Sequence, residues 1–252
     1  MTASEGATPA RPSLLIPFAL VAFSADVLIY YFTILPLRDW SVDRFEIPAW
    51  GILAHYGLRA VFAILAAAAM VRWRAMTVQD LGLRVAPFRE DAAWTLRLIA
   101  TLAVVSVVLM GVAIAVMRLF DVYPGSWPLE VRDPGGWGYY LLCSVVAAPL
   151  VEEFVYRSLL TPALRAGYGE RGAIVAGALL FYVLHLVYGA SFWKVHYLAA
   201  GAILTWAFLK RGRLWICVLL HAGGNLLVVL DDAVLQFAPQ LFKAIVGKLP
   251  PG

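Results

Sequence analysis

Three charged side chains interrupt the apolar stretch APLVEEFVYRSLL, which covers residues 148–160. Glu153 and Arg157 are four residues apart, so on a helix they share one face and can form an ion pair. Glu152 lies about 100° away around the same helix, and that pair leaves its charge without an explanation. Pro149 cannot donate a backbone hydrogen bond, which predicts a kink or a local opening beside Glu152.

Two further motifs place polar side chains within apolar runs. FYVLH puts Phe181 and His185 on one helix face, and HAGGN does the same for His221 and Asn225. A carboxylate beside an imidazole can activate water as a general base. A second imidazole and a carboxamide can donate hydrogen bonds to a developing oxyanion. Together these groups supply what amide hydrolysis without a covalent intermediate requires.

Each of these residues also has a structural explanation. Glu153 and Arg157 can join two helices, a histidine within a membrane is often a hydrogen-bonded packing residue, and the glycines of HAGGN permit close helix packing. Two histidines and a glutamate also form a known zinc site. However, the sequence has no HExxH motif, and a metal site leaves Asn225 without a role. We therefore predict no metal and no other cofactor.

The composition identifies the medium in which these residues lie. Of the 252 residues, 62% are hydrophobic and 14% are charged, and the mean hydropathy is +0.81. Soluble domains are usually about half apolar and about a quarter charged, so we predict an integral membrane protein. We attribute the net charge of +4 to basic loops and predict no nucleic-acid binding. Cys143 and Cys217 lie in apolar runs and are expected to be small buried hydrophobic residues.

Apolar runs that are long enough to cross a bilayer recur along the chain. We predict an all-α, polytopic membrane bundle of seven to eight transmembrane helices, because helices satisfy their backbone polar groups within lipid. The predicted spans are residues 14–37, 50–71, 98–117, 138–164, 172–192, 195–209 and 214–230, with a short eighth piece at 233–246 that either spans or lies on the surface. Basic residues in the loops number ten on one side and five on the other. This asymmetry predicts a cytoplasmic N-terminus in a cytoplasmic or inner membrane.

The predicted depths bring the polar motif residues together. At about 1.5 Å per residue, they fall in one layer about 10 Å thick on three helices, which scattered packing residues would not require. A charge within a bilayer is costly, so such a layer predicts a functional site. Asp26 and Arg59, in the first two predicted spans, are further charges within apolar runs. They could form an ion pair with each other, extend to an interface or line a substrate path, and we favour a structural role.

The three motifs EEFVYR, FYVLH and HAGGN occur in this order on successive predicted helices and cover residues 152–225. In pattern and order they resemble the CPBP (ABI) family, which includes the type II CAAX prenyl endopeptidases. The segment DLGLR, at residues 80–84, is also similar to this group. The resemblance implies a catalytic core at residues 138–232, preceded by three membrane helices and loops at 1–137 and followed by a short helix or tail at 233–252.

The resemblance also implies a glutamate-dependent, metal-independent intramembrane endopeptidase. Carried over by position, the six motif residues take three roles: water activation by Glu152 and His185, oxyanion binding by His221 and Asn225, and support of the site by Glu153 and Arg157. The implied partners are the lipid bilayer and a membrane-anchored or lipidated protein. This substrate is either a prenylated CAAX protein or a protein with a C-terminal sorting tag, as in sortase-like systems. A non-enzymatic immunity or scaffold protein of the same fold and a proton-coupled transporter are the alternatives.

Overall fold

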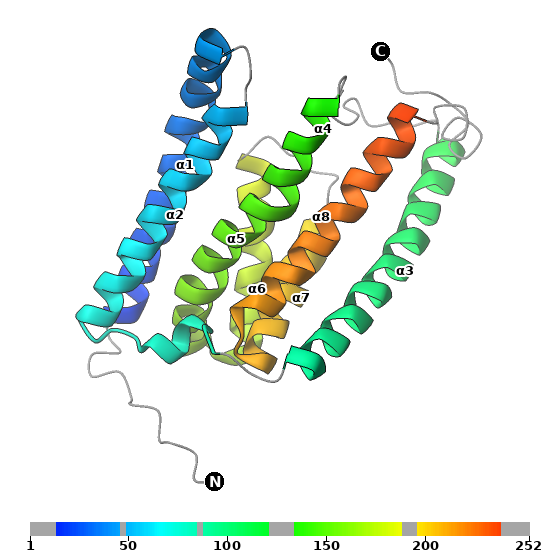
Figure 1. Ribbon diagram of the computed structural model, residues 1–252. Coiled ribbons are helices and arrows are strands. Elements are labelled where there is room, and N and C mark those ends of the chain that lie inside the picture. Colours follow the sequence, from blue (N-terminus) through cyan, green and yellow to red (C-terminus); the bar gives the residue numbers. More distant parts are fainter. Residues whose placement is uncertain (1–13, 46–48, 85–87, 121–133, 188–195, 238–252) are drawn as a thin grey trace.

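The computed structural model describes residues 14–45, 49–84, 88–120, 134–187 and 196–237. Every regular element in these ranges is helical, so the predicted all-α class is confirmed (Figure 1). The helices are α1 (Leu15–Phe45), α2 (Ala49–Arg72), the 3-10 turn η2 (Val78–Leu81), α3 (Phe88–Phe120), α4 (Pro134–Leu141), the π-helix η3 (Leu142–Ala147), α5 (Ala148–Glu153), the π-helix η4 (Phe154–Leu160), α6 (Thr161–Val187), α7 (His196–Arg211) and α8 (Leu214–Phe237).

Three helical runs of the described residues are long and apolar enough to cross a membrane, namely Leu15–Asp39, Trp50–Arg72 and Gly136–Leu186. They support an integral membrane protein, but they do not confirm seven to eight spans. The third run covers the predicted span 138–164 and most of the predicted span 172–192, and these are two helices joined at a kink at Gly169, where the backbone is non-helical with a φ of 70° and a ψ of −178°. α7 has 16 residues and is about 24 Å long, which is short for a bilayer core of about 30 Å.

The eighth predicted piece does not begin where we expected. α8 runs without interruption from Leu214 to Phe237, so the boundary predicted between residues 230 and 233 is wrong. The sequence signal there was the polar pair at 231 and 232, and aspartate lowers helix propensity only modestly. The first strong helix breaker, Pro239, lies with the rest of residues 238–246 outside the described residues.

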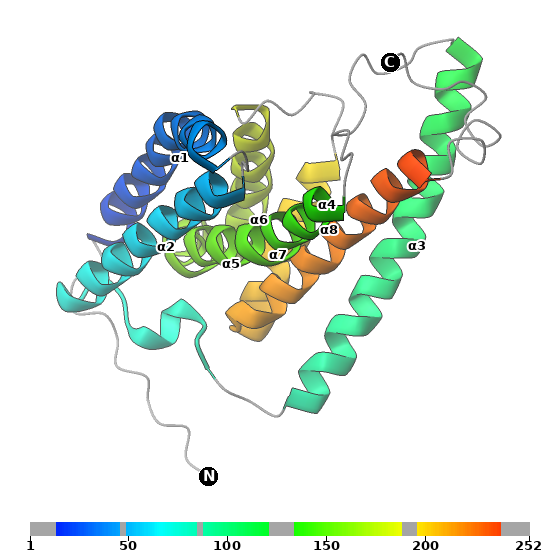
Figure 2. The ribbon, with the colours of Figure 1, turned by 45° about the horizontal axis from the view of Figure 1, so that its top comes forward.

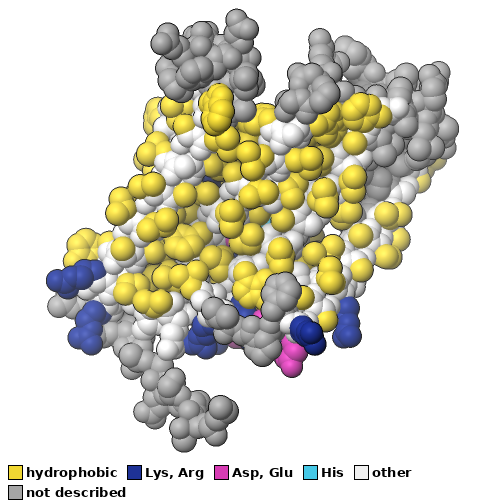
Figure 3. All heavy atoms as spheres, viewed as in Figure 1, with side chains coloured by type: hydrophobic (Ala, Val, Ile, Leu, Met, Phe, Trp, Pro, Cys, Tyr) yellow, Lys and Arg dark blue, Asp and Glu magenta, His cyan; other side chains and the backbone are white. Residues whose placement is uncertain are grey.

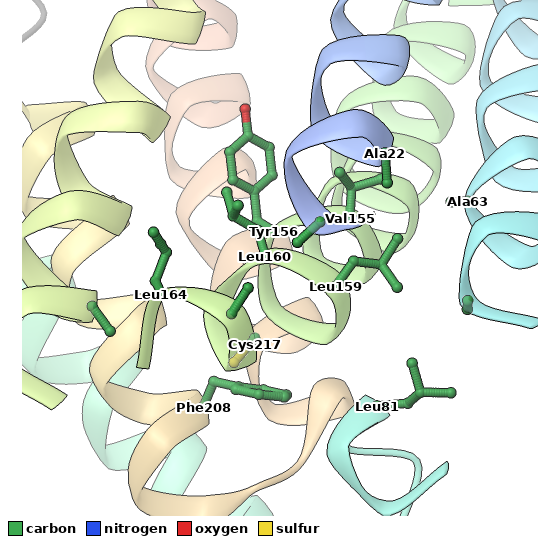
Figure 4. Close-up of a cluster of buried hydrophobic side chains, with 14 of the residues drawn as sticks. Ala22, Ala63, Leu81, Val155, Tyr156, Leu159, Leu160, Leu164, Phe208 and Cys217 are labelled. Atoms are coloured by element: carbon green, nitrogen blue, oxygen red, sulfur yellow. The ribbon is translucent and has the colours of Figure 1, made fainter. Parts of the chain in front are cut away.

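The α1–α2 hairpin packs through small side chains. Ala19 and Ala22 of α1 and Ala63 and Ala67 of α2 are all less than 5% exposed, and small residues let helix backbones approach closely. Figures 1 and 2 show these two helices side by side along their length. In the apolar core beyond them, Val155 of η4 lies next to Ala22, so the hairpin is packed directly on the segment that follows the glutamates (Figure 4).

The helix that carries the glutamates is opened on both sides of Pro149. The N–H of Ala148 donates to the carbonyl of Cys143, five residues back, and the N–H of Thr161 likewise donates to Tyr156. These i to i−5 bonds define π turns, which often occur at functional sites. The local opening that Pro149 predicts is therefore present, as a wider helical register on each side of α5.

The turn that contains DLGLR is attached to the core by specific hydrogen bonds. Oγ of Ser158 donates to the carbonyl of Leu81 at 2.7 Å, and the backbone N–H of Leu214 donates to the carbonyl of Gly82 at 2.9 Å. Gly82 has a φ of 71°, and a Cβ atom there would lie 2.6 Å from Cε2 of Phe208. This position therefore requires glycine both for its backbone conformation and for its close approach to Phe208.

α3 packs along α8, as Figures 1 and 2 show, and charged residues attach its first turns to the α7–α8 turn. Asp91 is fully buried and forms ion pairs with Arg213 and, at 3.9 Å, with Nη1 of Arg211. The Arg211 guanidinium also lies 4.9 Å from the ring centroid of Trp94. Figure 3 shows an apolar belt over the middle of the molecule, with Lys and Arg side chains gathered at its lower end.

Both cysteines are buried thiols. Cys143 is 7% exposed and Cys217 is inaccessible, and neither forms a disulfide. Sγ of Cys217 donates to the carbonyl of Leu204 at 3.5 Å. The prediction that they act as small buried hydrophobic residues is confirmed.

We predict that Gly82→Ala lowers the free energy of unfolding by roughly 2–4 kcal/mol, because a positive φ and a collision with Phe208 add together. The matched control is Gly212→Ala. Gly212 has a φ of 61°, and a Cβ atom at this position would have no other atom within 4 Å, so its cost should be about 1 kcal/mol from the backbone alone. Thermal unfolding of both variants in detergent measures the difference. Equal losses would contradict the close packing of Phe208 on Gly82.

Candidate active site

Glu153 is fully buried and lies between two partners. Its Oε1 accepts a hydrogen bond from Nδ1 of His221 at 2.8 Å, and its Oε2 lies 3.0 Å from Nε of Arg157. Arg157 is also fully buried, with its guanidinium 5.3 Å from the ring centroid of Phe181. The ion pair expected from the four-residue spacing is therefore present, and His221 joins it from α8.

Glu152 has a different set of neighbours. Its side chain lies at the edge of the buried region, with the residue 6% exposed, and its Oε1 is 3.9 Å from Nη1 of Arg59 on α2. Arg59 donates from Nε and Nη2 to the two carboxylate oxygens of Asp26, at 2.8 and 2.7 Å. Of the alternatives for Asp26 and Arg59, the ion pair is therefore present. Glu153 therefore pairs with other motif residues, whereas Glu152 lies beside a residue of the N-terminal hairpin.

His185 is oriented by its own helix and by a tyrosine. Its Nδ1 lies 2.7 Å from the carbonyl oxygen of Phe181. A carbonyl only accepts, so Nδ1 carries the proton and donates, and Nε2 is the acceptor of the neutral ring. The imidazole stacks on Tyr197 with ring centroids 3.9 Å apart. The Phe181 ring lies 4.4 Å from His185 and 5.8 Å from His221, so the histidines of the two motifs meet at Phe181.

Asn225 compensates for the π register of η3. In that register the carbonyl of Ser144 would receive the N–H of residue 149, five positions on, but Pro149 has no N–H. Nδ2 of Asn225 donates to this carbonyl at 2.7 Å. A buried carbonyl without a donor is unfavourable. Asn225 therefore has a structural bond to the glutamate-bearing helix, and the second N–H of its amide is not used in that bond.

The predicted site residues lie on neighbouring helices. However, the residues that contact one another are not those that we had assigned to the same role. His221 contacts Glu153, a residue that we had assigned only to support. Glu152 contacts Arg59, and its charge also acts on Tyr197, which stacks on His185. Sequence reasoning missed the place of Tyr197 beside this site. No motif marks that residue, whereas Arg59 was visible as a charge within an apolar run.

His185 and His221 are the side chains through which this site could bind a metal. Among the described residues, no group of three His, Cys, Asp or Glu side chains converges as a ligand set. Nδ1 of His185 and Nδ1 of His221 each donate to an oxygen. This arrangement suits a histidine that acts as a base at Nε2 and also one that binds a metal there. Chelation is therefore an informative experiment.

Comparison with known proteins gives a match, which covers the central part of the chain. Residues 134–227 match the family model described as type II CAAX prenyl endopeptidase Rce1-like. The match begins at the first residue of α4, ends within α8 and includes all six predicted site residues. No curated protein and no solved structure matches the chain. Over residues 134–227, the chain is therefore similar to the Rce1-like type II CAAX prenyl endopeptidases, which supports the resemblance to the CPBP family carried by the three motifs.

Proposed function

We propose that the protein is an intramembrane endopeptidase that hydrolyses a peptide bond near the C-terminus of a membrane-tethered protein. The observation that carries the proposal is the contrast between Glu152 and Glu153. Glu153 is bonded to His221 and Arg157, whereas Glu152 lies at the edge of the buried cluster beside Arg59. Two adjacent carboxyl groups in different environments suit different chemical roles. The Rce1-like family of residues 134–227 supports the same activity.

Water activation is the role that we propose for Glu152 and His185. The Glu152 carboxylate accepts a proton from a water molecule as the water oxygen attacks the scissile carbonyl. Nε2 of His185, the acceptor nitrogen of the neutral ring, orients that water. The proton then passes to the departing amine, so the peptide bond breaks without a covalent intermediate and without a net change in protons on the enzyme.

Oxyanion stabilisation is the role that we propose for His221 and Asn225. Nδ1 of His221 donates to Glu153, so its Nε2 can donate only when the ring is an imidazolium. Arg157 pairs with the second carboxylate oxygen of Glu153. The unused N–H of Asn225 supplies the second donor. These bonds strengthen as negative charge develops on the carbonyl oxygen.

The substrate and the topology belong to the same proposal. The substrate is a prenylated CAAX protein, and a C-terminal sorting tag is the second candidate. Seven to eight crossings with a cytoplasmic N-terminus in a cytoplasmic or inner membrane would place the site within the bilayer. Residues 138–232 form the catalytic core in this proposal, and residues 1–137 and 233–252 flank it.

We expect Glu152→Gln to lower turnover at least about 10²-fold, because glutamine retains the shape of the side chain but cannot accept the proton. The measurement is cleavage of a farnesylated C-a-a-X peptide, and in parallel of a C-terminal tag peptide, by protein in liposomes. An unchanged melting temperature controls for folding. Wild-type turnover in this variant would sink the general-base role, and an inert wild-type protein would favour the non-enzymatic scaffold.

Asn225→Ala should lower turnover roughly 10²–10³-fold, the usual effect of removing one oxyanion donor, and should also lower stability by about 1 kcal/mol. Pro149→Ala separates the two effects. It supplies the backbone N–H that the Ser144 carbonyl lacks in the π register, so it should reduce the stability loss caused by Asn225→Ala. Turnover should stay low in the double variant. Recovery of both stability and turnover would mean that Asn225 only bonds the neighbouring helix.

Chelators should leave hydrolysis largely intact. The sequence has no HExxH motif, and water activation by Glu152 requires no Lewis acid. Turnover is measured after treatment with EDTA or phenanthroline and again after zinc is added. Activity that is lost on chelation and restored by zinc would instead assign Glu152, His185 and His221 to a metal site.

A further inference from the structure

Arg59 connects the N-terminal hairpin with the candidate general base. It lies on α2, outside the family-matched residues 134–227, and is fully buried. Its Nη1 is 3.9 Å from Oε1 of Glu152. A cation at this distance attracts a carboxylate, and a low-dielectric environment strengthens the attraction.

The guanidinium of Arg59 is held in one orientation. Nε and Nη2 donate to the two oxygens of Asp26 in a bidentate arrangement, which fixes the plane of the group. The rings of Tyr30 and Tyr56 lie 5.4 and 5.8 Å from its central carbon atom. With two nitrogens bound to Asp26, the third nitrogen, Nη1, is the one near Glu152.

We propose that Arg59 is a positioning residue that orients the Glu152 carboxylate for proton transfer from water. Asp26 serves this arrangement by holding Arg59. The inference rests on the proposed role of Glu152 as general base. It extends the site to the α1–α2 hairpin, which the family match does not include.

The uncharged titratable groups around Glu152 come from three helices. Tyr30 of α1, Tyr56 of α2 and Tyr197 of α7 all interact electrostatically with its carboxylate. Phenols are neutral throughout the ordinary working range of pH. They therefore shape the surroundings of Glu152 without supplying a counter-charge.

The charged groups divide into two sets. Glu153 is bonded to Arg157 and His221, which act on that carboxylate first. The Asp26 carboxylate repels that of Glu152, but Arg59 is paired with both. Arg59 is therefore the cation that attracts the Glu152 carboxylate, and Asp26 acts on Glu152 by holding Arg59.

Turnover of a farnesylated C-a-a-X peptide by protein in liposomes tests this role. Arg59→Gln should lower kcat by up to roughly 10²-fold and change KM little, because it releases the Glu152 carboxylate without altering the groups that bind the substrate. Arg59→Lys should recover part of kcat, because its positive charge can still attract Glu152. Asp26→Asn should lower kcat less than Arg59→Gln, because Arg59 remains but is no longer held by a bidentate pair.

The double variant Asp26→Asn/Arg59→Gln provides the matched control. It replaces the ion pair with uncharged groups of similar shape, so no buried charge is left unpaired and folding is preserved better than in either single variant. We expect kcat to stay low in this double variant while its melting temperature recovers. A merely structural pair would instead give wild-type turnover once folding is restored, which would overturn the proposal.

Glu152→Gln separates this inference from the proposed function. If Glu152→Gln abolishes hydrolysis while folded Arg59→Gln keeps the wild-type kcat, the positioning role fails and the proposed function stands. If Arg59→Gln lowers kcat but Glu152→Gln still hydrolyses the peptide, the general-base role of Glu152 fails and Arg59 acts on another group of the site.

Discussion

The buried carboxylate of Glu153 is the constraint around which the helical core is arranged. An unpaired charge in an apolar interior is strongly unfavourable, so the fold must bring a partner to each of its oxygens. Arg157 comes from the next turn of the same helix, and His221 comes from α8. The pairing sets the rotation of α8 relative to the glutamate-bearing helix. Because His221 is then near Phe181, it also brings α8 to the residues of FYVLH.

The backbone makes this arrangement possible through departures from the ideal α-helix. α5 has only six residues and lies between two π segments, and it carries Pro149, Glu152 and Glu153. A π turn adds a residue to each turn and leaves carbonyls to be satisfied from elsewhere. Asn225 satisfies one of them from α8. The same side chain is therefore part of the helix packing and a candidate donor in the site, so these two functions are not independent.

The helical class, the ion pair and the opening at Pro149 could be predicted because each follows from local spacing. Glu153 and Arg157 are one turn apart, and a proline inside a continuous helical run removes one of its backbone hydrogen bonds. The contact between Glu153 and His221 joins residues 68 positions apart, and no periodic pattern encodes it. The stacking of Tyr197 on His185 likewise depends on the approach of α7 to α6. The number of membrane spans stays a prediction, because only three helical runs of the described residues are long and apolar enough to cross a membrane.

The two buried cysteines have a practical consequence for mapping the topology. A thiol must be accessible and ionised to react, and Cys143 and Cys217 lie at 7% and 0% exposure without a disulfide. The two native thiols should therefore react very little with water-soluble maleimides. Single cysteines introduced at exposed positions such as Arg165 and Glu170 could be labelled from either side of the membrane without first removing the native thiols. The sidedness of the molecule can thus be determined on the unaltered core.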